Sequence, residues 1–122
     1  MQLRLALEAA HMGTWEWDIT NQRVIWSEKK EAMFGLEKGS FDGTYETFIN
    51  CVHPEDRHFV HNQIQTVYQQ GTEYDLEFRI LMPDRSISWI ISKGRVFRNP
   101  DGATVKMCGV DLDITNRKQA EL

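Results

Sequence analysis

Four side chains between residues 51 and 61 have the chemistry to bind a metal or a cofactor. They are Cys51, His53, His58 and His61. His58 and His61 are three positions apart, so on a helix they share one face. No carboxylate or second cysteine completes a recognised ligand spacing, and the sequence therefore predicts no metal site. Because His61 lies beside the apolar stripe of the predicted helix and not within it, we expect both His58 and His61 to be solvated surface residues.

A second group of side chains has the chemistry to hold a small molecule. Its members are large apolar residues from well-separated parts of the chain, which a folded domain could bring together between a sheet and its helices: Trp17, Trp26, Phe48, Ile64, Phe78, Trp89 and Met107. One interpretation is a pocket for a small, partly apolar ligand. The other is a packed core, because aromatic residues at regular spacing are usually core. The sequence leaves both interpretations open.

Catalytic signatures are missing from the sequence. It contains no Gly-x-Ser-x-Gly, no phosphate-binding Gly-Lys-Ser/Thr loop and no His-Glu-x-x-His. The carboxylates of Glu55 and Asp56 are better explained as the start of a helix, where Pro54 presets the backbone and acidic side chains meet exposed amides. We therefore expect that this domain is not itself an enzyme.

The elements that must position these residues follow from hydrophobic periodicity. Helices are predicted at 3–10, 28–34, 45–52 and 54–70, and strands at 14–19, 23–26, 74–80, 87–96 and 104–113. In the strand at 87–96, Ile87, Trp89 and Ile91 are interpreted as one apolar face, with a bulge near Lys93-Gly94 that shifts the alternation. Hairpin-linked strands with the helices grouped between them predict an α+β fold with an antiparallel sheet.

Composition limits the class of protein. A chain of 122 residues is one domain, and a net charge of −4 with mixed signs argues against nucleic acid as a partner. No apolar run is long enough to cross a membrane, so we expect no membrane insertion by this segment. Two cysteines without metal-type spacing suit reduced thiols, which predicts a cytoplasmic domain, although the parent protein could be anchored in a membrane elsewhere.

Several local motifs, in this order, resemble a PAS domain with its C-terminal PAC segment, the sensory box of bacterial signalling proteins. They are LALEAAHMGTWEWDIT, WSEKKEAMFGL, HPEDR, YDLEFRI and GVDLDIT. The resemblance implies a five-stranded antiparallel sheet in the order 2-1-5-4-3, with short helices on one face. It divides the chain into an N-terminal flanking helix at 1–11, a PAS/PAC sensor domain at 12–115, and the start of a connecting signalling helix at 116–122.

The same resemblance implies a function. We expect a sensory or dimerising module that forms a homodimer and passes ligand or packing changes to a C-terminal output domain, such as a histidine kinase or a diguanylate cyclase. Asp113, Ile114 and Thr115 are the residues expected to transmit the signal, with Thr115 as the cap of the helix that follows. A ligand-free structural dimerisation domain is the alternative from a different class.

Haem and flavin sensors are the third alternative. Blue-light sensors of the family hold a cysteine in an Asn-Cys-Arg-Phe-Leu-Gln run, whereas here Asn50-Cys51 is followed by Val52-His53-Pro54. The flavin-contacting residues are therefore missing, and Cys51 is interpreted as a small apolar helix residue. Haem sensors of the family bind iron through a histidine on the long helix, for which His58 and His61 are weak candidates. We expect no cofactor or an unknown small molecule, not haem or flavin.

Overall fold

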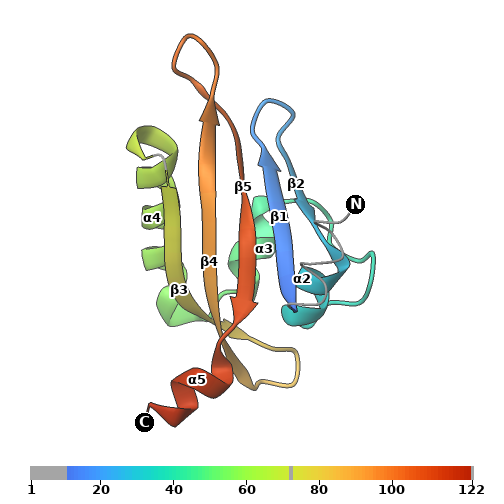
Figure 1. The fold of residues 1–122 in the computed structure, drawn as a ribbon. Helices are drawn as coiled ribbons and strands as arrows, with labels where there is room; N and C mark the ends of the chain where they lie inside the picture. The colour runs from blue at the N-terminus through green and yellow to red at the C-terminus, as the bar shows by residue number, and fades with distance from the viewer. Residues whose placement is uncertain (1–10, 72, 122) are drawn as a thin grey trace.

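The computed structural model describes residues 11–71 and 73–121, so the predicted helix at 3–10 lies outside the described part. One antiparallel sheet runs through the molecule, with its five strands in the order β2-β1-β5-β4-β3 (Figure 1). The strands are β1 (Met12–Asp18), β2 (Arg23–Trp26), β3 (Glu73–Leu81), β4 (Ile87–Arg98) and β5 (Thr104–Asp113). The fold class and the strand order expected from the sequence are both confirmed.

Within residues 11–71 and 73–121, three helices lie across one face of the sheet and a fourth follows its last strand. They are α2 (Glu28–Met33), α3 (Tyr45–Cys51), α4 (Arg57–Gln70) and α5 (Thr115–Ala120), with a 3₁₀ turn (Pro54–Asp56) before α4. Side-chain oxygens begin two of them: Ser27 Oγ accepts from the Lys30 amide at 3.2 Å, and Thr44 Oγ1 from the Thr47 amide at 3.2 Å. In Figure 1, α3 and α4 lie behind the strands, α2 lies at the lower ends of β1 and β2, and α5 projects beyond one end of the sheet.

The helix-covered face of the sheet carries the core. On β3 the alternation places Tyr74, Leu76, Phe78 and Ile80 inside, as the sequence predicts. Phe78 and Ile80 are fully buried, and burying a side chain of this size contributes roughly 1.5–3 kcal/mol each. The residues of β3 between them face the opposite, outer side of the sheet.

The prediction that Ile87, Trp89 and Ile91 form the core-facing side of β4 is wrong. Ile90 and Ser92 are the buried residues of this strand, and Phe78 pairs with Ile90 while Arg79 pairs with Trp89. Trp89 therefore lies on the outer face with Arg79. With the inner positions assigned correctly, the alternation runs through Lys93-Gly94 without interruption, and the register shift falls instead at Phe97/Arg98.

No helix in the described residues is long and apolar enough to cross a membrane.

Candidate functional site

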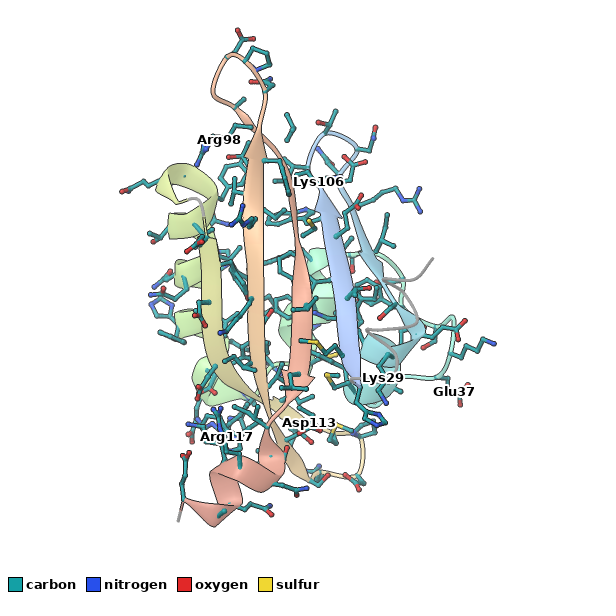
Figure 2. The ribbon with its side chains drawn as sticks, viewed as in Figure 1. Lys29, Glu37, Arg98, Lys106, Asp113 and Arg117 are labelled. Carbon is teal, nitrogen blue, oxygen red and sulfur yellow. The ribbon has the colours of Figure 1, made fainter. Side chains whose placement is uncertain are left out.

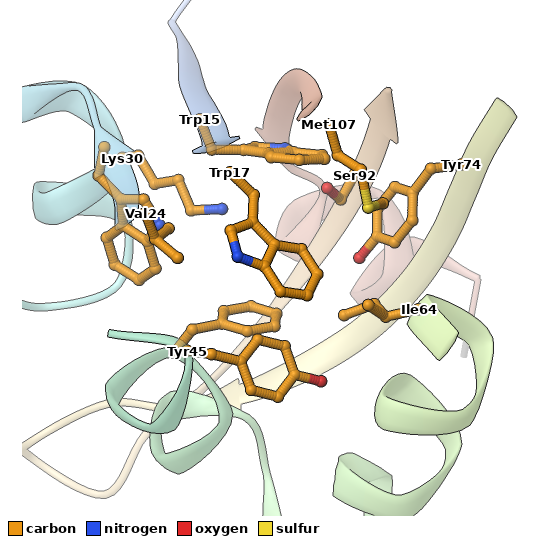
Figure 3. Close-up of a pocket in the computed structure, with 11 residues that line it drawn as sticks. Trp15, Trp17, Val24, Lys30, Tyr45, Ile64, Tyr74, Ser92 and Met107 are labelled. Carbon is orange, nitrogen blue, oxygen red and sulfur yellow. The ribbon is translucent and has the colours of Figure 1, made fainter. Parts of the chain in front are cut away.

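A small cavity lies between the sheet and helices α2, α3 and α4 (Figure 3). Its volume is about 40 Å³, and eleven residues line it: Trp15, Trp17, Val24, Trp26, Lys30, Tyr45, Phe48, Ile64, Tyr74, Ser92 and Met107. A water molecule needs roughly 10–15 Å³ of such space. The cavity as described therefore has room for two or three waters, and a drug-sized ligand, which needs roughly 300–1,000 Å³, would require the walls to move.

A buried ion pair lies beside this cavity, and the absence of a side chain at Gly13 makes room for it. Gly13 on β1 pairs with Asp111 on β5, so the two residues lie in one row across the sheet. A Cβ atom at Gly13 would lie 2.8 Å from Lys30 Cβ, so any side chain there would push α2 away. With glycine in place, Lys30 Nζ donates to Asp111 Oδ2 at 2.8 Å.

The two charges of this pair are almost completely removed from water. The side chain of Lys30 is 4% exposed and that of Asp111 is 0% exposed. Burial lowers the pKa of Lys30 because it disfavours the ammonium, and the Asp111 carboxylate opposes this shift. Aromatic rings supply further stabilisation, since Nζ lies 4.7 Å from the ring centroid of Trp26 and 4.9 Å from that of Phe34.

The indole of Trp15 forms one wall of the cavity and lies over a glycine of the sheet. A Cβ atom at Gly94 would come within 2.8 Å of this ring, so glycine allows the indole to approach the strand. The far edge of Trp15 meets Tyr74 in a T-shaped contact, with 5.4 Å between ring centroids. Within the described residues, Trp15 Nε1 and Asp111 Oδ1 are buried atoms without a hydrogen-bond partner.

Trp17 and Tyr45 form the wall towards the outside. Their rings stack with 5.4 Å between centroids and 20° between planes. The Tyr45 hydroxyl forms a 2.9 Å hydrogen bond with His61 Nδ1 on α4, at the surface. Burial raises the pKa of Tyr45 to about 12, so the phenol stays neutral at physiological pH. Trp17 and Tyr45 also line a more open hollow on the outside, together with Gln65 and Tyr68.

The predicted pocket residues divide into three groups. Trp17, Trp26, Phe48, Ile64 and Met107 line the cavity. Phe78 is buried in the adjoining core, with its ring centroid 6.1 Å from that of Phe48. Trp89 lies on the other face of the sheet and cannot contribute to the cavity, because strand parity places it beside Arg79.

Two charged residues of the site were not predicted from the sequence, although each has a signal there. Lys30 precedes Met33 and Phe34 by three and four positions, so it shares their face of α2. Asp111 has the same parity as Met107 on β5, which places it on the inner face of the sheet. A lysine and an aspartate on two inner faces that pack together indicate a buried pair.

Neither the two histidine candidates for haem nor Cys51 lines the cavity. Both histidine candidates are exposed: His58 Nε2 lies 3.0 Å from Asn62 Nδ2 on the surface, and His61 bonds to Tyr45. Among the described residues that line the cavity there is neither a histidine nor a cysteine. Burial raises the pKa of the Cys51 thiol, which works against the thiolate form.

The predicted transmission residues lie where β5 passes into α5. Ile114 is 5% exposed, and its amide donates to the Trp89 carbonyl at 2.8 Å. Thr115 is the first residue of α5, so the predicted cap position is wrong by one residue and belongs to Ile114. Thr115 Oγ1 instead accepts from the Trp89 amide at 2.9 Å and donates to Asp113 Oδ1 at 2.6 Å.

Helix α5 also contacts the outer face of its own sheet. Lys118 Nζ lies 2.7 Å from a Glu77 oxygen and 4.8 Å from the ring centroid of Trp89, while Arg117 reaches Glu77 at 3.1 Å. Figure 2 shows Asp113 and Arg117 at this same end of the molecule. Exposed ion pairs of this kind contribute roughly 0.2–1 kcal/mol, so α5 is held only weakly.

Comparison with known proteins identifies the family of the chain. The PAS fold family matches residues 23–111. Sensor protein FixL of Bradyrhizobium diazoefficiens is 27% identical over 118 residues, which are 97% of this chain and 23% of that protein. Probable diguanylate cyclase DgcE of Escherichia coli is 27% identical over 97% of this chain and 10% of its own length.

A solved structure has the same fold along nearly the whole chain. It comes from a sensory box histidine kinase/response regulator of Burkholderia thailandensis E264, with 26% identity and a TM-score of 0.83. The alignment covers 99% of this chain and 90% of that one. By contrast, the chain spans less than a quarter of the length of either curated relative described above.

Proposed function

Because the chain belongs to the PAS fold family, we propose that it is the sensory module of a larger signalling protein and that it is not itself catalytic. In this proposal the module spans residues 12–115, and α5, which begins at Thr115, is the start of the helix that connects it to a C-terminal output domain. A histidine kinase or a diguanylate cyclase is the output that fits the relatives. Two copies of the module associate, and the protein acts in the cytoplasm.

One observation carries this proposal: the aspartate of the buried ion pair lies on β5, the strand that leads directly into α5. Asp111, which holds Lys30, is followed after one residue by Asp113, whose carboxylate accepts from the Thr115 amide at 2.9 Å. A change in the cavity that moves Asp111 therefore has a path of only four residues to the helix. Extended backbone rises about 3.3 Å per residue, so the path is short and stiff.

The mechanism requires two conformations with different affinity for the ligand. A ligand that binds both conformations equally shifts nothing, whatever its affinity. Contacts between the ligand and Lys30 would give the two conformations different affinities, because Lys30 both lines the cavity and binds Asp111. Movement of β5 then alters how Ile114 and Thr115 hold the Trp89 backbone, and the direction of α5 changes with it.

The small cavity volume of about 40 Å³ favours a second candidate, a dimerisation module without a ligand. In that case the aromatic residues act only as core, and changes in dimer packing reach α5 directly. The two candidates differ in whether filling the cavity alters the output.

The test uses the chain with its natural downstream sequence and a readout of phosphoryl transfer or cyclic dinucleotide synthesis. Ser92→Val adds apolar volume at a buried residue that lines the cavity. Ser40→Val makes the same exchange in an exposed loop. We expect Ser92→Val to change the output at least about threefold, equivalent to about 0.6 kcal/mol of population shift, while Ser40→Val leaves it unchanged. Unchanged output from a folded Ser92→Val protein supports the ligand-free candidate.

A further inference from the structure

The charge balance of the cavity limits what can bind there. Of the described residues that line the cavity, Lys30 is the only one with an ionisable group that is charged at neutral pH, and it is already paired with Asp111. The pair has zero net charge whether the shared proton is on the amine or on the carboxylate. An anion would add an uncompensated buried charge next to Asp111, and a cation would add one next to Lys30. The cavity therefore favours an uncharged ligand.

The polar groups at the cavity are mainly hydrogen-bond donors. Lys30 Nζ uses one N–H on Asp111, and a lysine ammonium has three. The Trp15 indole N–H is buried and has no acceptor in the described residues. The hydroxyl of Tyr74 stays protonated because burial raises its pKa, with the Asp111 carboxylate acting in the same direction. A bound molecule with an acceptor would satisfy donors that are costly to leave unpaired.

The walls of the cavity determine the shape of the ligand that can fit. Figure 3 shows Trp15 across the top, the Trp17 ring in the centre and Tyr45 below, with the Lys30 amine pointing in from the side. Flat aromatic faces pack best against a flat partner, by offset stacking or edge contacts. Ile64 and Met107 add apolar surface to the lining of the cavity.

Trp17 and Tyr45 provide the way in. Together with Val24 they line both the inner cavity and the outer hollow, so they separate the two spaces. A molecule with more than a few heavy atoms exceeds the 40 Å³ available, so it can enter only if a wall of the cavity moves, and this aromatic pair is the wall that faces the outer hollow. The Tyr45–His61 hydrogen bond is exposed and links the pair to α4.

We propose that the ligand of this sensor is a small, uncharged, planar molecule with one hydrogen-bond acceptor, which lies against Trp15 and Trp17 and accepts from Lys30. This inference rests on the proposed function, because it assumes that the cavity is the sensing site. It goes further by naming the ligand class and the residue that selects it.

Three probes of similar size test the inference on the 122-residue chain. Benzonitrile is planar and neutral with one acceptor, toluene lacks the acceptor, and benzoate carries a negative charge. The four tryptophan indole N–H signals in nuclear magnetic resonance spectra, assigned by Trp→Phe variants, report binding at the cavity. We expect benzonitrile to shift the Trp15 and Trp17 signals and to bind at least about tenfold more tightly than toluene or benzoate, as one hydrogen bond to a charged group predicts.

Variants of the ion pair identify the selecting residue. Lys30→Met alone leaves Asp111 buried without its partner, so the double variant Lys30→Met/Asp111→Leu is the informative one. In this double variant benzonitrile and toluene should bind with about equal affinity, because the lysine that donates the hydrogen bond is gone. Lys29→Met makes the same exchange at the neighbouring position of α2, outside the cavity lining, and keeps the preference.

Equal binding of the three probes, tighter binding of benzoate, or binding of none of them would overturn the inference. So would a benzonitrile preference that survives in a folded Lys30→Met/Asp111→Leu protein. These outcomes leave the proposed function to its own test, because the response of the output to Ser92→Val does not depend on any probe.

Discussion

Lys30 Nζ and Asp111 Oδ2 lie 2.8 Å apart in the interior, although the two residues are 81 positions apart in the chain. Their contact joins α2 to β5, the strand that leads to the C-terminal helix. Asp111 Oδ1 has no partner in the described residues, so the carboxylate depends on Lys30 for its compensation. The pair therefore joins α2, which lines the cavity, to β5, the strand that leads to the C-terminal end of the domain.

Breaking this pair from one side should be costly. We expect Lys30→Met to lower the free energy of unfolding by about 3–5 kcal/mol, because it leaves an uncompensated charge in the interior. The double variant Lys30→Met/Asp111→Leu should recover most of that loss, since it removes both charges and keeps the volume filled. Urea unfolding at neutral pH measures both. If the double variant is no more stable than the single one, the pair is not the reason for the loss.

Asp56 connects the start of α4 to β3 and predicts a dependence on pH. Its carboxylate accepts from Arg79 Nη2 at 2.6 Å, from Nε at 3.1 Å and from the Arg79 amide at 2.9 Å. Asp56→Ala should cost about 2 kcal/mol of unfolding free energy at pH 7, since these bonds involve charged groups. Glu55→Ala is the control: Glu55 also contacts Arg79, at 3.2 Å, but is 74% exposed, so a change near zero is expected.

The direction in which stability changes with pH follows from the direction of the pKa shift of Asp56. The hydrogen bond from the Arg79 side chain holds the pKa of Asp56 below its ordinary value of 3.8. A carboxyl group whose pKa is lowered on folding stabilises the protein above its unfolded value and loses that contribution as the pH falls through the folded value. The stability difference between wild type and Asp56→Ala should therefore be complete above about pH 5 and shrink below pH 4. A difference that stays constant down to pH 2 would contradict this assignment.

Tyr45 should control how fast a molecule reaches the cavity. Tyr45→Phe keeps the ring that stacks on Trp17 and removes only the bond to His61. An exposed hydrogen bond of this type contributes about 1 kcal/mol or less, so association and dissociation of benzonitrile should both become up to about fivefold faster with little change in affinity. Tyr68→Phe, in the outer hollow but not in the cavity lining, should leave both rates unchanged. Line-shape analysis of the indole signals measures these rates, and unchanged rates in Tyr45→Phe would exclude the entrance proposed here.

The helices and strands could be predicted from the sequence because the residue patterns that indicate them are local. Alternation fixes β3, turn residues fix the hairpins, and Ser27 and Thr44 mark the starts of two helices where the structure has them. The strand order came from the resemblance to a family, because pairing of β1 with β5 depends on contacts across the whole chain. No local pattern determines such a pairing.

The candidate site could be predicted only in part from the sequence, for two physical reasons. On β4 both faces carry apolar residues, so the pattern could not show that Ile90 and not Trp89 faces the core. Lysine and aspartate are rarely fully buried, so their residue types alone do not indicate the pairing of Lys30 with Asp111. The cost of burying each charge is offset mainly by the other, and that compensation cannot be seen until the two elements are placed together.

Thr115 gives the last prediction, which concerns the passage from sheet to helix. Thr115→Ala removes the acceptor of the Trp89 amide and the donor to Asp113, while Thr115→Ser keeps both. The loss of one such bond costs about 1 kcal/mol, so the Trp89 amide should exchange its hydrogen about fivefold faster in Thr115→Ala and at the wild-type rate in Thr115→Ser. The global unfolding free energy should change by no more than that amount, because the cavity and the ion pair are untouched. In the protein with its downstream sequence, Thr115→Ala should then reduce the effect of Ser92→Val on the output, since β5 no longer holds the start of α5 firmly. Wild-type exchange at Trp89 together with an undiminished response to Ser92→Val would show that the signal leaves the domain by another route, such as the contacts of Lys118 with Glu77 and Trp89.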